Sequence, residues 1–373
     1  MKTGILGGGQ LARMIMEECY KFGYEFYIFS GEENSPAGQL TKNGFTGDWK
    51  DRESLLKFAE KCDIITLENE FIDYGSLKFL EASGITVYPQ ADIIGLIQDK
   101  LYQKENLRNA GIPVAAFCAV ESEEDIFNFI SVNSFPVVLK SRTMGYDGKG
   151  NYTVRNSSEV KPAFELLKKR GRLMCESFIN FDKEIATQIA RNKSGGKKVY
   201  PVVETIQKDH ICNMVIASDQ LQEKIIHKAN LIAENIADEL NYVGVMGIEM
   251  FLSGDEITVN ELAPRVHNSG HYTIEGCRTS QFENHIRAVL NQPLGNTEKT
   301  EKNAVMINIL GERNGRADLR NAEKIFDFGN AFLHIYGKAE TCIGRKMGHI
   351  TVLDKNLSEA VDTAVRCREI ISI

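Results

Sequence analysis

The chain has 373 residues, of which 43% are hydrophobic and 25% are charged, as in an ordinary globular protein. This length predicts roughly two or three domains and a core that needs neither disulfides nor a structural metal. The formal net charge of −7 argues against a nucleic-acid coat or a protein of anionic membranes, because both need a basic surface. It leaves open a small anionic substrate in a locally basic pocket.

The eight cysteines favour a cytoplasmic location. No two of them form a C-x-x-C pair, and we see neither a small secreted chain nor a signal peptide, so disulfides are not expected. Buried, reduced thiols are expected instead. No apolar run approaches the roughly 18 residues of a membrane-spanning helix.

Residues 1–96 alternate between strand and helix patterns, which predicts a parallel α/β sheet. The helix patterns carry apolar residues at helical spacing, such as Leu11, Met14 and Ile15 in the first of them. The expected strands are 3–8, 25–30, 62–68 and 84–89, and the expected helices are 10–23, 52–61 and 74–83.

A glycine turn joins the first strand to the first helix, with Gly7, Gly9 and Ala12 in the pattern G-x-G-x-x-A. Free N–H groups at a helix N-terminus make such a turn an anion site. Glu32 stands about where a dinucleotide site has its ribose-binding acid. A lone fingerprint is weak evidence, so a dinucleotide, another phosphate ligand and a structural turn all remain open. We favour a phosphate ligand that is not a dinucleotide.

Residues 97–112 are expected to form one helix, and 135–141 a strand that ends near Lys140. The loop after Lys140 contains Gly145, Gly148 and Gly150, so its backbone could close over phosphates beside the ammonium group. It is not a P-loop, because the glycine spacing differs and a strand follows instead of a helix. The pattern predicts a nucleotide-binding flap, and a flexible hairpin tip is the alternative.

The region that follows is rich in strands and is expected to be antiparallel. A hairpin that turns near 254–255 would place Glu249 and Glu261 within about one residue pair of each other. With Asn260, these hard oxygen donors in apolar strands suit Mg²⁺; pairing with Lys or Arg is the alternative. The expected elements are strands 172–179, 183–191, 199–207, 243–252, 257–263, 304–311, 332–337 and 348–354, and helices 158–170 and 222–240 with one more at the C-terminus.

Six motifs in chain order carry a resemblance to a known family: "GILGGGQLARM", "LENEF", "GYDGKG", "GVMGIEMF", "NELAPRVHNSGH" and "VMINILG". The chain resembles the ATP-grasp superfamily and, within it, the family of 5-(carboxyamino)imidazole ribonucleotide synthases of purine biosynthesis. The resemblance covers essentially the whole chain and implies an α/β and α+β fold. It implies a Rossmann-like pre-ATP-grasp domain (1–96), an ATP-grasp region (97–290) with a lid at about 115–178 and a metal and nucleotide sheet at about 179–290, and a C-terminal extension (291–373) in a mixed-sheet domain that packs on the substrate site.

The family reaction uses ATP, bicarbonate and 5-aminoimidazole ribonucleotide, with Mg²⁺ or, as its substitute, Mn²⁺, and the resemblance implies a homodimer. It implies that Glu249 and Glu261 bind the metal. The implied ATP contacts are Lys100, Lys140, Gly145, Tyr146, Asp147, Gly148, Lys149, Gly150, Asn151, Glu176, Ser177, Phe178, Ile179, Glu184, Gln207, Asn260 and Glu261. The implied contacts of the acceptor ribonucleotide are Gly9, Gln10, Glu70, Arg265, His267, Asn268, Ser269, Lys338 and Arg345. The implied catalytic residues are Tyr146, Asp147, Arg265, His267 and Asn268.

Two features depart from the family pattern. Many members have His where this chain has Gln207, and many have Gly and Gln where this chain has Met144 and Asn151. We expect these departures to leave the phosphate chemistry intact and to concern only the details of nucleotide contacts and of flap mobility. The alternatives are an ATP-grasp enzyme with another acid or acceptor, such as a formate-using transformylase or a biotin carboxylase, and a nucleotide-binding protein without catalysis. The sequence does not decide whether the carboxyl group is transferred directly or as CO₂.

Overall fold

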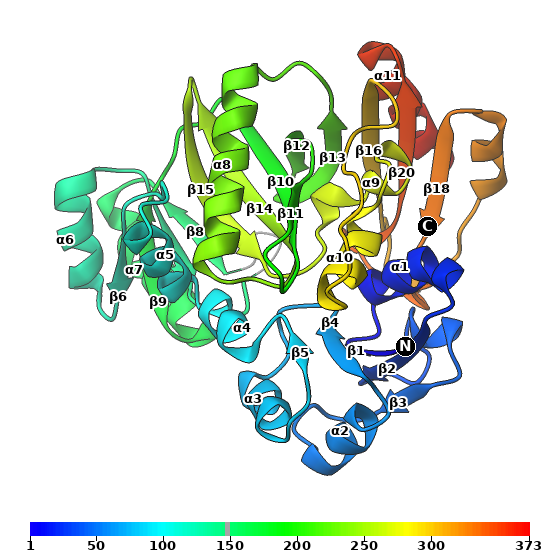
Figure 1. Cartoon of the computed structure of the whole chain (residues 1–373). Coiled ribbons are helices and arrows are strands. Elements are labelled where there is room, and N and C mark those ends of the chain that lie inside the picture. The colour runs from blue at the N-terminus through cyan, green and yellow to red at the C-terminus, as the bar shows by residue number, and fades with distance from the viewer. Residues whose placement is uncertain (146–149) are drawn as a thin grey trace.

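The computed structural model describes residues 1–145 and 150–373, whose strands form three main sheets and a two-stranded ribbon (Figure 1). In Figure 1 the N-terminal sheet lies at the bottom, a small sheet lies at the left, and the largest sheet fills the upper part. None of the helices in these two ranges is both long and apolar enough to cross a membrane.

The N-terminal sheet is parallel, as the sequence predicts, with the strand order β3-β2-β1-β4-β5. The chain leaves β1 for β2 on one side and later adds β4 on the other, so the order reverses at β1. The loops after β1 and β4 therefore flank a crevice at the carboxyl ends of the strands, which is where open α/β sheets bind ligands. Its elements are β1 (Lys2–Leu6), α1 (Gln10–Cys19), β2 (Glu25–Ser30), β3 (Gly44–Thr46), α2 (Arg52–Ala59), β4 (Ile64–Leu67), α3 (Tyr74–Ala82) and β5 (Val87–Tyr88).

The single helix expected at 97–112 is wrong. The chain forms α4 (Ala91–Gln98) and α5 (Lys100–Asn109), which are separated at Asp99. The backbone of Asp99 is extended, and its carboxylate accepts from Leu101 N at 3.0 Å as the N-cap of α5. The same carboxylate forms a two-pronged ion pair with Arg142. The capping bond and the ion pair together stabilise Asp99 in its extended conformation, so the helix is interrupted there.

A small antiparallel sheet with the order β6-β9-β7-β8 follows, and two helices cover one of its faces. It carries Lys140 on β7 and Glu176 on the neighbouring β9. The elements are β6 (Phe117–Val120), α6 (Glu123–Asn133), β7 (Val137–Ser141), β8 (Asn151–Val154), α7 (Ser157–Leu167) and β9 (Leu173–Ser177).

The largest sheet has the order β15-β14-β10-β12-β13-β16-β20-β18, with β11 beside β10. All of its named strand pairs are antiparallel, and Val114 adds an isolated parallel bridge to Val259 at its edge. The strands are β10 (Lys183–Arg191), β11 (Lys197–Val199), β12 (Val203–Lys208), β13 (Ile211–Ala217), β14 (Gly244–Ser253), β15 (Glu256–Ala263), β16 (Asn303–Leu310), β18 (Ala331–Ile335) and β20 (Lys346–Asp354).

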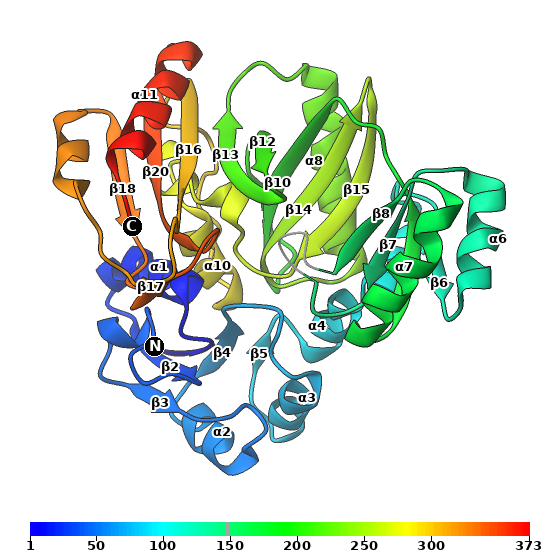
Figure 2. The same ribbon diagram turned by 180° about the vertical axis from the view of Figure 1, so that it is seen from behind.

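The C-terminal strands continue this sheet, because β13 pairs with β16 and β16 pairs with β20. Figure 2 shows α11 lying along β16 and β20, where its apolar side joins their core. The domain boundary expected at 290 is thus no break in the sheet, and the domain limits stay a prediction. The remaining elements are α8 (Glu223–Glu239), α9 (Thr273–Gly276), α10 (Gln281–Val289), the ribbon strands β17 (Gly315–Arg316) and β19 (Glu340–Thr341), and α11 (Leu357–Ile370).

Apolar contacts fix the N-terminal crevice against the large sheet. On α1, Met14 and Ile15 are buried in one cluster with Phe282 and Ile286 of α10. The helix α10 in turn packs against β14. Burial of this kind stabilises by about 25 cal/mol for each Å² of apolar surface, so α1 and β14 keep a fixed separation.

Candidate active site

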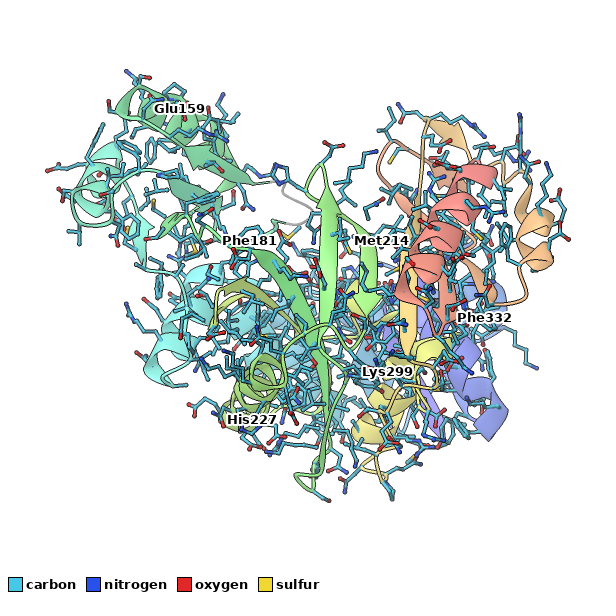
Figure 3. All side chains as sticks on the ribbon, turned by 90° about the horizontal axis from the view of Figure 1, so that it is seen from above. Glu159, Phe181, Met214, His227, Lys299 and Phe332 are labelled. Carbon is cyan, nitrogen blue, oxygen red and sulfur yellow. The ribbon has the colours of Figure 1, made fainter. Side chains whose placement is uncertain are left out.

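A cleft of about 680 Å³ lies where the three sheets meet, and most of the described candidate residues line it. Seen from above, the small sheet (near Glu159) and the C-terminal strands (near Phe332) lie on opposite sides of the region around Phe181 and Met214 (Figure 3). The candidates in the wall are Gly9, Gln10, Glu70, Lys100, Lys140, Gly145, Asn151, Glu176, Ser177, Phe178, Ile179, Glu184, Gln207, Glu249, Asn260, Glu261, Arg265, His267, Asn268, Lys338 and Arg345.

Some candidates are placed elsewhere. Gly150 and Ser269 are buried and do not line the cleft. Tyr146, Asp147, Gly148 and Lys149, expected in the flap, lie outside the described residues. The proposed roles of all six residues stay predictions.

The hairpin of β14 and β15 brings the two carboxylates of the predicted metal site together. Glu249 pairs directly with Glu261, while Met250 pairs with Val259, so Asn260 is the extra residue of a β-bulge. A bulge turns a side chain that would otherwise point to the other face, and Asn260 and Glu261 accordingly both line the cleft. The hairpin register expected from the sequence is therefore confirmed.

The donor set fits a hard divalent cation. Two carboxylates and one amide oxygen are suitable ligands for Mg²⁺, which commonly completes its shell with water and phosphate oxygens. No group of three or more His, Cys, Asp or Glu side chains in 1–145 and 150–373 could hold a metal by itself. Glu249 lies 3.3 Å from Nε2 of His267. Burial opposes its ionisation, but His267 and Lys100 outweigh burial and lower the pKa of Glu249 to about 2.

Each predicted phosphate-binding lysine forms an ion pair with a carboxylate in this structure. Lys100 pairs with Glu261, and Lys140 pairs with Glu176. Lys104, one turn after Lys100 on α5, also approaches Glu176, at 3.3 Å. Burial opposes the charge of Glu176, but Lys140 and Lys104 together lower its pKa to about 2. Glu176 is therefore an anion that keeps a second cation if Lys140 moves to a phosphate.

Apolar and acidic groups from β9, β10 and β14 form the side of the cleft predicted for the nucleoside. The rings of Phe181 and Phe251 are stacked, with their centres 4.6 Å apart. Burial raises the pKa of Glu184 on β10, which a hydrogen bond with Gln207 on the neighbouring β12 opposes. A flat apolar wall beside a carboxylate suits an adenine ring and its ribose hydroxyls.

The crevice of the N-terminal sheet forms the opposite side of the cleft. A Cβ on Gly9 would lie 2.2 Å from Oε1 of Glu68, so any larger residue there would displace the Glu68 carboxylate. Leu11 N at the start of α1 donates to Glu68 Oε1 at 3.3 Å. A protein carboxylate thus receives the N–H groups that the sequence suggested for a phosphate, and the exposed position of Glu32 gives the dinucleotide interpretation no support. The neighbouring cation is Lys338, which donates to Gln10 Oε1 at 2.6 Å.

The predicted acceptor residues of the 265–269 segment are firmly held. Arg265 forms a two-pronged ion pair with Glu70, and burial opposes this charge less than Glu70 supports it, so the pKa of Arg265 is raised. Asn268 exchanges hydrogen bonds with Asn308 at 2.8 and 3.0 Å. Burial lowers the pKa of Lys338 to about 8.

Sequence reasoning missed three charged residues. Glu68 and Lys346 line the cleft, and Lys104 supports Glu176 behind it. Lys104 had a usable signal, because it stands four residues after Lys100 on one helix and so shares its face. Glu68 and Lys346 come from distant segments, and no local pattern brings them together.

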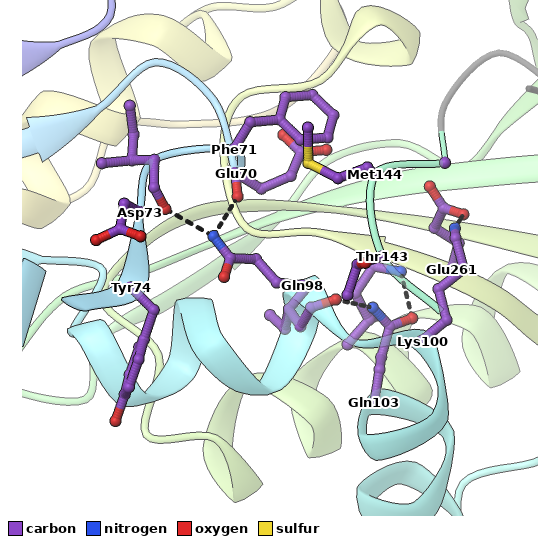
Figure 4. A pocket seen from close by; sticks show the side chains of 14 residues that line it. Glu70, Phe71, Asp73, Tyr74, Gln98, Lys100, Gln103, Thr143, Met144 and Glu261 are labelled. Carbon is purple, nitrogen blue, oxygen red and sulfur yellow. Dashed lines mark hydrogen bonds and ion pairs between the residues drawn. The ribbon is translucent and has the colours of Figure 1, made fainter. Parts of the chain in front are cut away.

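A smaller pocket of about 280 Å³ adjoins the cleft (Figure 4). Lys100 and Glu261 belong to the walls of both spaces, and Phe71 and Met144 close the pocket on another side. Gln98 crosses it and donates to the carbonyl groups of Glu70 and Ile72, both at 2.7 Å. This pocket is therefore a recess behind the Lys100–Glu261 pair.

Three family models match the chain: the ribonucleotide synthetase preATP-grasp domain at residues 1–98, the ATP-grasp domain at 105–282, and the phosphoribosylaminoimidazole carboxylase C-terminal domain at 304–363. The phosphoribosylaminoimidazole carboxylase of Saccharomyces cerevisiae is 40% identical over 96% of this chain, and the match spans 64% of that relative's length. The N5-carboxyaminoimidazole ribonucleotide synthase of Synechococcus elongatus is 37% identical, over 94% of this chain and 89% of the relative.

A solved structure has the same fold. It is the N5-carboxyaminoimidazole synthase of Aspergillus clavatus in complex with ADP and 5-aminoimidazole ribonucleotide. The similarity covers 99% of this chain and 98% of that one, with a TM-score of 0.90 and 35% identity. N5-carboxyaminoimidazole ribonucleotide and 5-(carboxyamino)imidazole ribonucleotide are two names for one compound.

Proposed function

The chain belongs to the N5-carboxyaminoimidazole ribonucleotide synthase family of ATP-grasp ligases, and we propose that it carboxylates the amine of 5-aminoimidazole ribonucleotide. Bicarbonate oxygen attacks the γ-phosphorus of ATP, which gives carboxyphosphate and ADP. The amine nitrogen then bonds to the carboxyl carbon as phosphate leaves, and the nitrogen loses one proton. Release of CO₂ before this attack would give the same products.

The lysines and the apolar wall support the ATP part of this proposal. Lys100 and Lys140 exchange carboxylate partners for phosphate oxygens, and Lys104 continues to neutralise Glu176. Phosphoryl transfer needs positioning and charge neutralisation more than covalent help from the protein. Fixed ammonium groups in a cleft supply both with little reorganisation.

Glu249 and Glu261, with Asn260, are the residues that would hold Mg²⁺, with Mn²⁺ as a substitute. The bound cation neutralises phosphate charge and orients the transferred group. Among the protein groups, His267 holds Glu249 at 3.3 Å, so the carboxylate is already directed toward the cleft.

The acceptor is expected between the N-terminal crevice and the 265–269 segment. Lys338 and Arg345 offer cations for a phosphate, and Arg265, whose fork is held by Glu70, adds a fixed positive charge for a carboxylate-like anion. The observation that carries the proposal is the continuity of one short segment. Asn260, Glu261, Arg265, His267 and Asn268 all line one cleft, so the metal and nucleotide expected at 260–261 would adjoin the acceptor expected at 265–269.

ADP release tests the proposal. We expect turnover that requires both bicarbonate and 5-aminoimidazole ribonucleotide, with formate inactive in place of bicarbonate. Turnover stimulated by formate, and not by bicarbonate, would assign the chain to another ATP-grasp reaction. Binding of ATP with no turnover under any combination would contradict an enzymatic role.

A homodimer and a cytoplasmic location are further parts of the proposal. All eight cysteines lie in the described ranges as thiols that form no disulfide, which is typical of a reducing compartment. Light scattering during size-exclusion chromatography would measure the mass, for which we expect twice that of one chain.

A further inference from the structure

The ring of His267 is held by a chain of buried polar groups that the proposed reaction does not assign. Ser269 Oγ lies 2.8 Å from Nδ1 of His267, and Gln188 Nε2 donates to the same Oγ at 2.8 Å. On the other side of the ring, Nε2 lies 3.3 Å from Glu249 Oε1 in the cleft. The ring thus links the cleft to a series of buried hydrogen bonds behind it, formed by Ser269 and Gln188.

The backbone of His267 is fixed as firmly as its ring. Gln281 accepts from His267 N at 2.9 Å and donates to His267 O at 2.7 Å. A Cβ on Gly270 would lie 2.6 Å from Gln281 Oε1 and 2.8 Å from Gln188 Cδ, so the chain packs closely against both glutamines. A Cβ on Gly247 would meet His267 Cβ at 2.5 Å.

Burial of Gln188 costs more free energy than a purely structural role would require. It is fully buried on β10, and its Oε1 has no hydrogen-bond partner among the described residues. An unsatisfied buried acceptor costs about 1–3 kcal/mol. Such local exceptions to polar satisfaction are expected at functional sites.

The donors and acceptors give this series of hydrogen bonds a direction. Ser269 Oγ receives one N–H from Gln188 and keeps one proton and one lone pair, so it can donate to or accept from the nearby Nδ1 of His267. The backbone N–H of Ser269 also points at Nδ1, at 3.4 Å, as the N-cap contact of the short 3-10 helix Asn268–Gly270. A backbone N–H can only donate, so it needs an unprotonated Nδ1; Ser269 Oγ then donates to Nδ1 as well, and the proton of the neutral ring is on Nε2.

We propose that Gln188 and Ser269 are positioning residues that hold neutral His267 in its Nε2–H tautomer, so that the ring presents a hydrogen-bond donor to the cleft. This inference extends the proposed function, because it sets what His267 can do there. With its lone pair turned away from the cleft, the neutral ring stabilises an anion such as carboxyphosphate. It does not remove the proton of the acceptor amine.

Nitrogen NMR of the full chain labelled with ¹⁵N-histidine tests the tautomer directly. The signals of His267 are identified by their loss in His267→Gln, and spectra are recorded at about pH 9, above the usual pKa of imidazole. We expect Nδ1 to show the shift of an unprotonated nitrogen and Nε2 that of a protonated one. A proton on Nδ1 overturns the proposal, and this wild-type result needs no variant to fold.

Two variants test the chain of donors. Gln188→Glu replaces the donor with an acceptor, so Ser269 turns its proton away and the ring proton moves to Nδ1. Ser269→Ala removes the main donor and gives a mixture of tautomers. Thr187→Val is the matched control, because Thr187 is equally buried on β10 but bonds to Tyr200 O instead. His267 signals that stay unchanged in both test variants overturn the proposal.

Kinetics separate this inference from the proposed function. We expect Ser269→Ala to lower kcat with 5-aminoimidazole ribonucleotide by about 10-fold or more, the usual effect of losing an orienting partner, with KM for ATP changed much less than kcat. A rise in KM for ATP as large as the fall in kcat would indicate a general structural defect and overturn the positioning role. Absence of turnover in the wild type would contradict the proposed function and leave the NMR result standing.

Discussion

Paired charges dominate the cleft at the scale of single residues. Lys100 pairs with Glu261, Lys140 with Glu176, and Arg265 with Glu70. Removing one partner of a buried pair leaves an uncompensated charge and destabilises strongly. Glu to Gln removes the charge but keeps the side-chain volume and one acceptor oxygen, so it disturbs the surrounding structure less than truncation to Ala does.

Glu261→Gln tests the metal-ligand role. We expect at least about a 100-fold loss of turnover, because one of two carboxylates is lost, while far-ultraviolet circular dichroism stays unchanged. Glu256→Gln is the control, since Glu256 lies on the same strand with its side chain 84% exposed. Near-normal turnover of Glu261→Gln would contradict its role as a metal ligand.

The Lys104–Glu176 contact predicts a pH dependence of stability. Glu176 has a pKa of about 2 in place of 4.5, so its contribution is present above about 4.5 and is lost as the pH falls toward 2. In Lys104→Met the pKa of Glu176 is lowered less, so the free energy of unfolding falls less between about pH 6 and about pH 3. Urea titrations measure this difference.

Lys57→Met is the control for that experiment, because Lys57 and Glu53 form an exposed pair and such pairs contribute little to stability. Parallel pH profiles of wild type and Lys104→Met would contradict the contribution assigned to Lys104.

At the scale of elements, two local irregularities position the site. The bulge at Asn260 turns two neighbouring side chains of β15 toward the cleft. The break at Asp99 starts α5 with Lys100 as its first residue. These two irregularities therefore direct the predicted metal ligands and the predicted phosphate-binding lysine toward the cleft.

Asp99→Ala tests the helix break. It removes the N-cap of α5 and leaves Arg142 unpaired, so we expect a loss of about 3 kcal/mol in unfolding free energy and a raised KM for ATP. Asp51→Ala removes the N-cap of α2, which lies away from the cleft. This control should lower the unfolding free energy by about 1 kcal/mol and leave KM for ATP unchanged. A KM for ATP in Asp99→Ala equal to that of the wild type would contradict the role of Asp99 in positioning Lys100.

Local patterns explain what the sequence could predict. The parallel strands and the pairing of Glu249 with Glu261 follow from periodicity and from one hairpin turn. The helix α10 was missed because Gln281, Asn284 and His285 make it look solvent-exposed, whereas it is buried between α1 and β14. Tertiary packing decides such cases.

Spatial proximity explains what the sequence could not predict. Glu68 follows β4, and Lys346 begins β20, yet both line one cleft. The donor chain behind His267 likewise joins Gln188 of β10 to Ser269. One sequence contains no distance between these segments, so only the fold brings them together.

At the scale of the whole molecule, the cleft depends on three sheets that each supply a different function. The small sheet carries Lys140, the large sheet carries the Glu249–Glu261 pair, and the N-terminal crevice carries Gln10 near Lys338. Within the large sheet and the segment that follows it, the residues predicted for the two ligands are also separate, at 260–261 for ATP and at 265–269 for the acceptor. Substitutions at Asn260 should impair ATP use, and substitutions at Asn268 should mainly impair acceptor-dependent turnover.

The central claim is that a bicarbonate oxygen attacks ATP, and oxygen-isotope transfer tests it most directly. The chain is mixed with ATP, 5-aminoimidazole ribonucleotide and bicarbonate labelled with ¹⁸O, and the released phosphate is measured by mass spectrometry before the label exchanges with water. If carboxyphosphate forms, the broken bond lies between carbon and the bridging oxygen, and each phosphate carries one labelled oxygen. Unlabelled phosphate released during acceptor-dependent turnover would contradict this reaction.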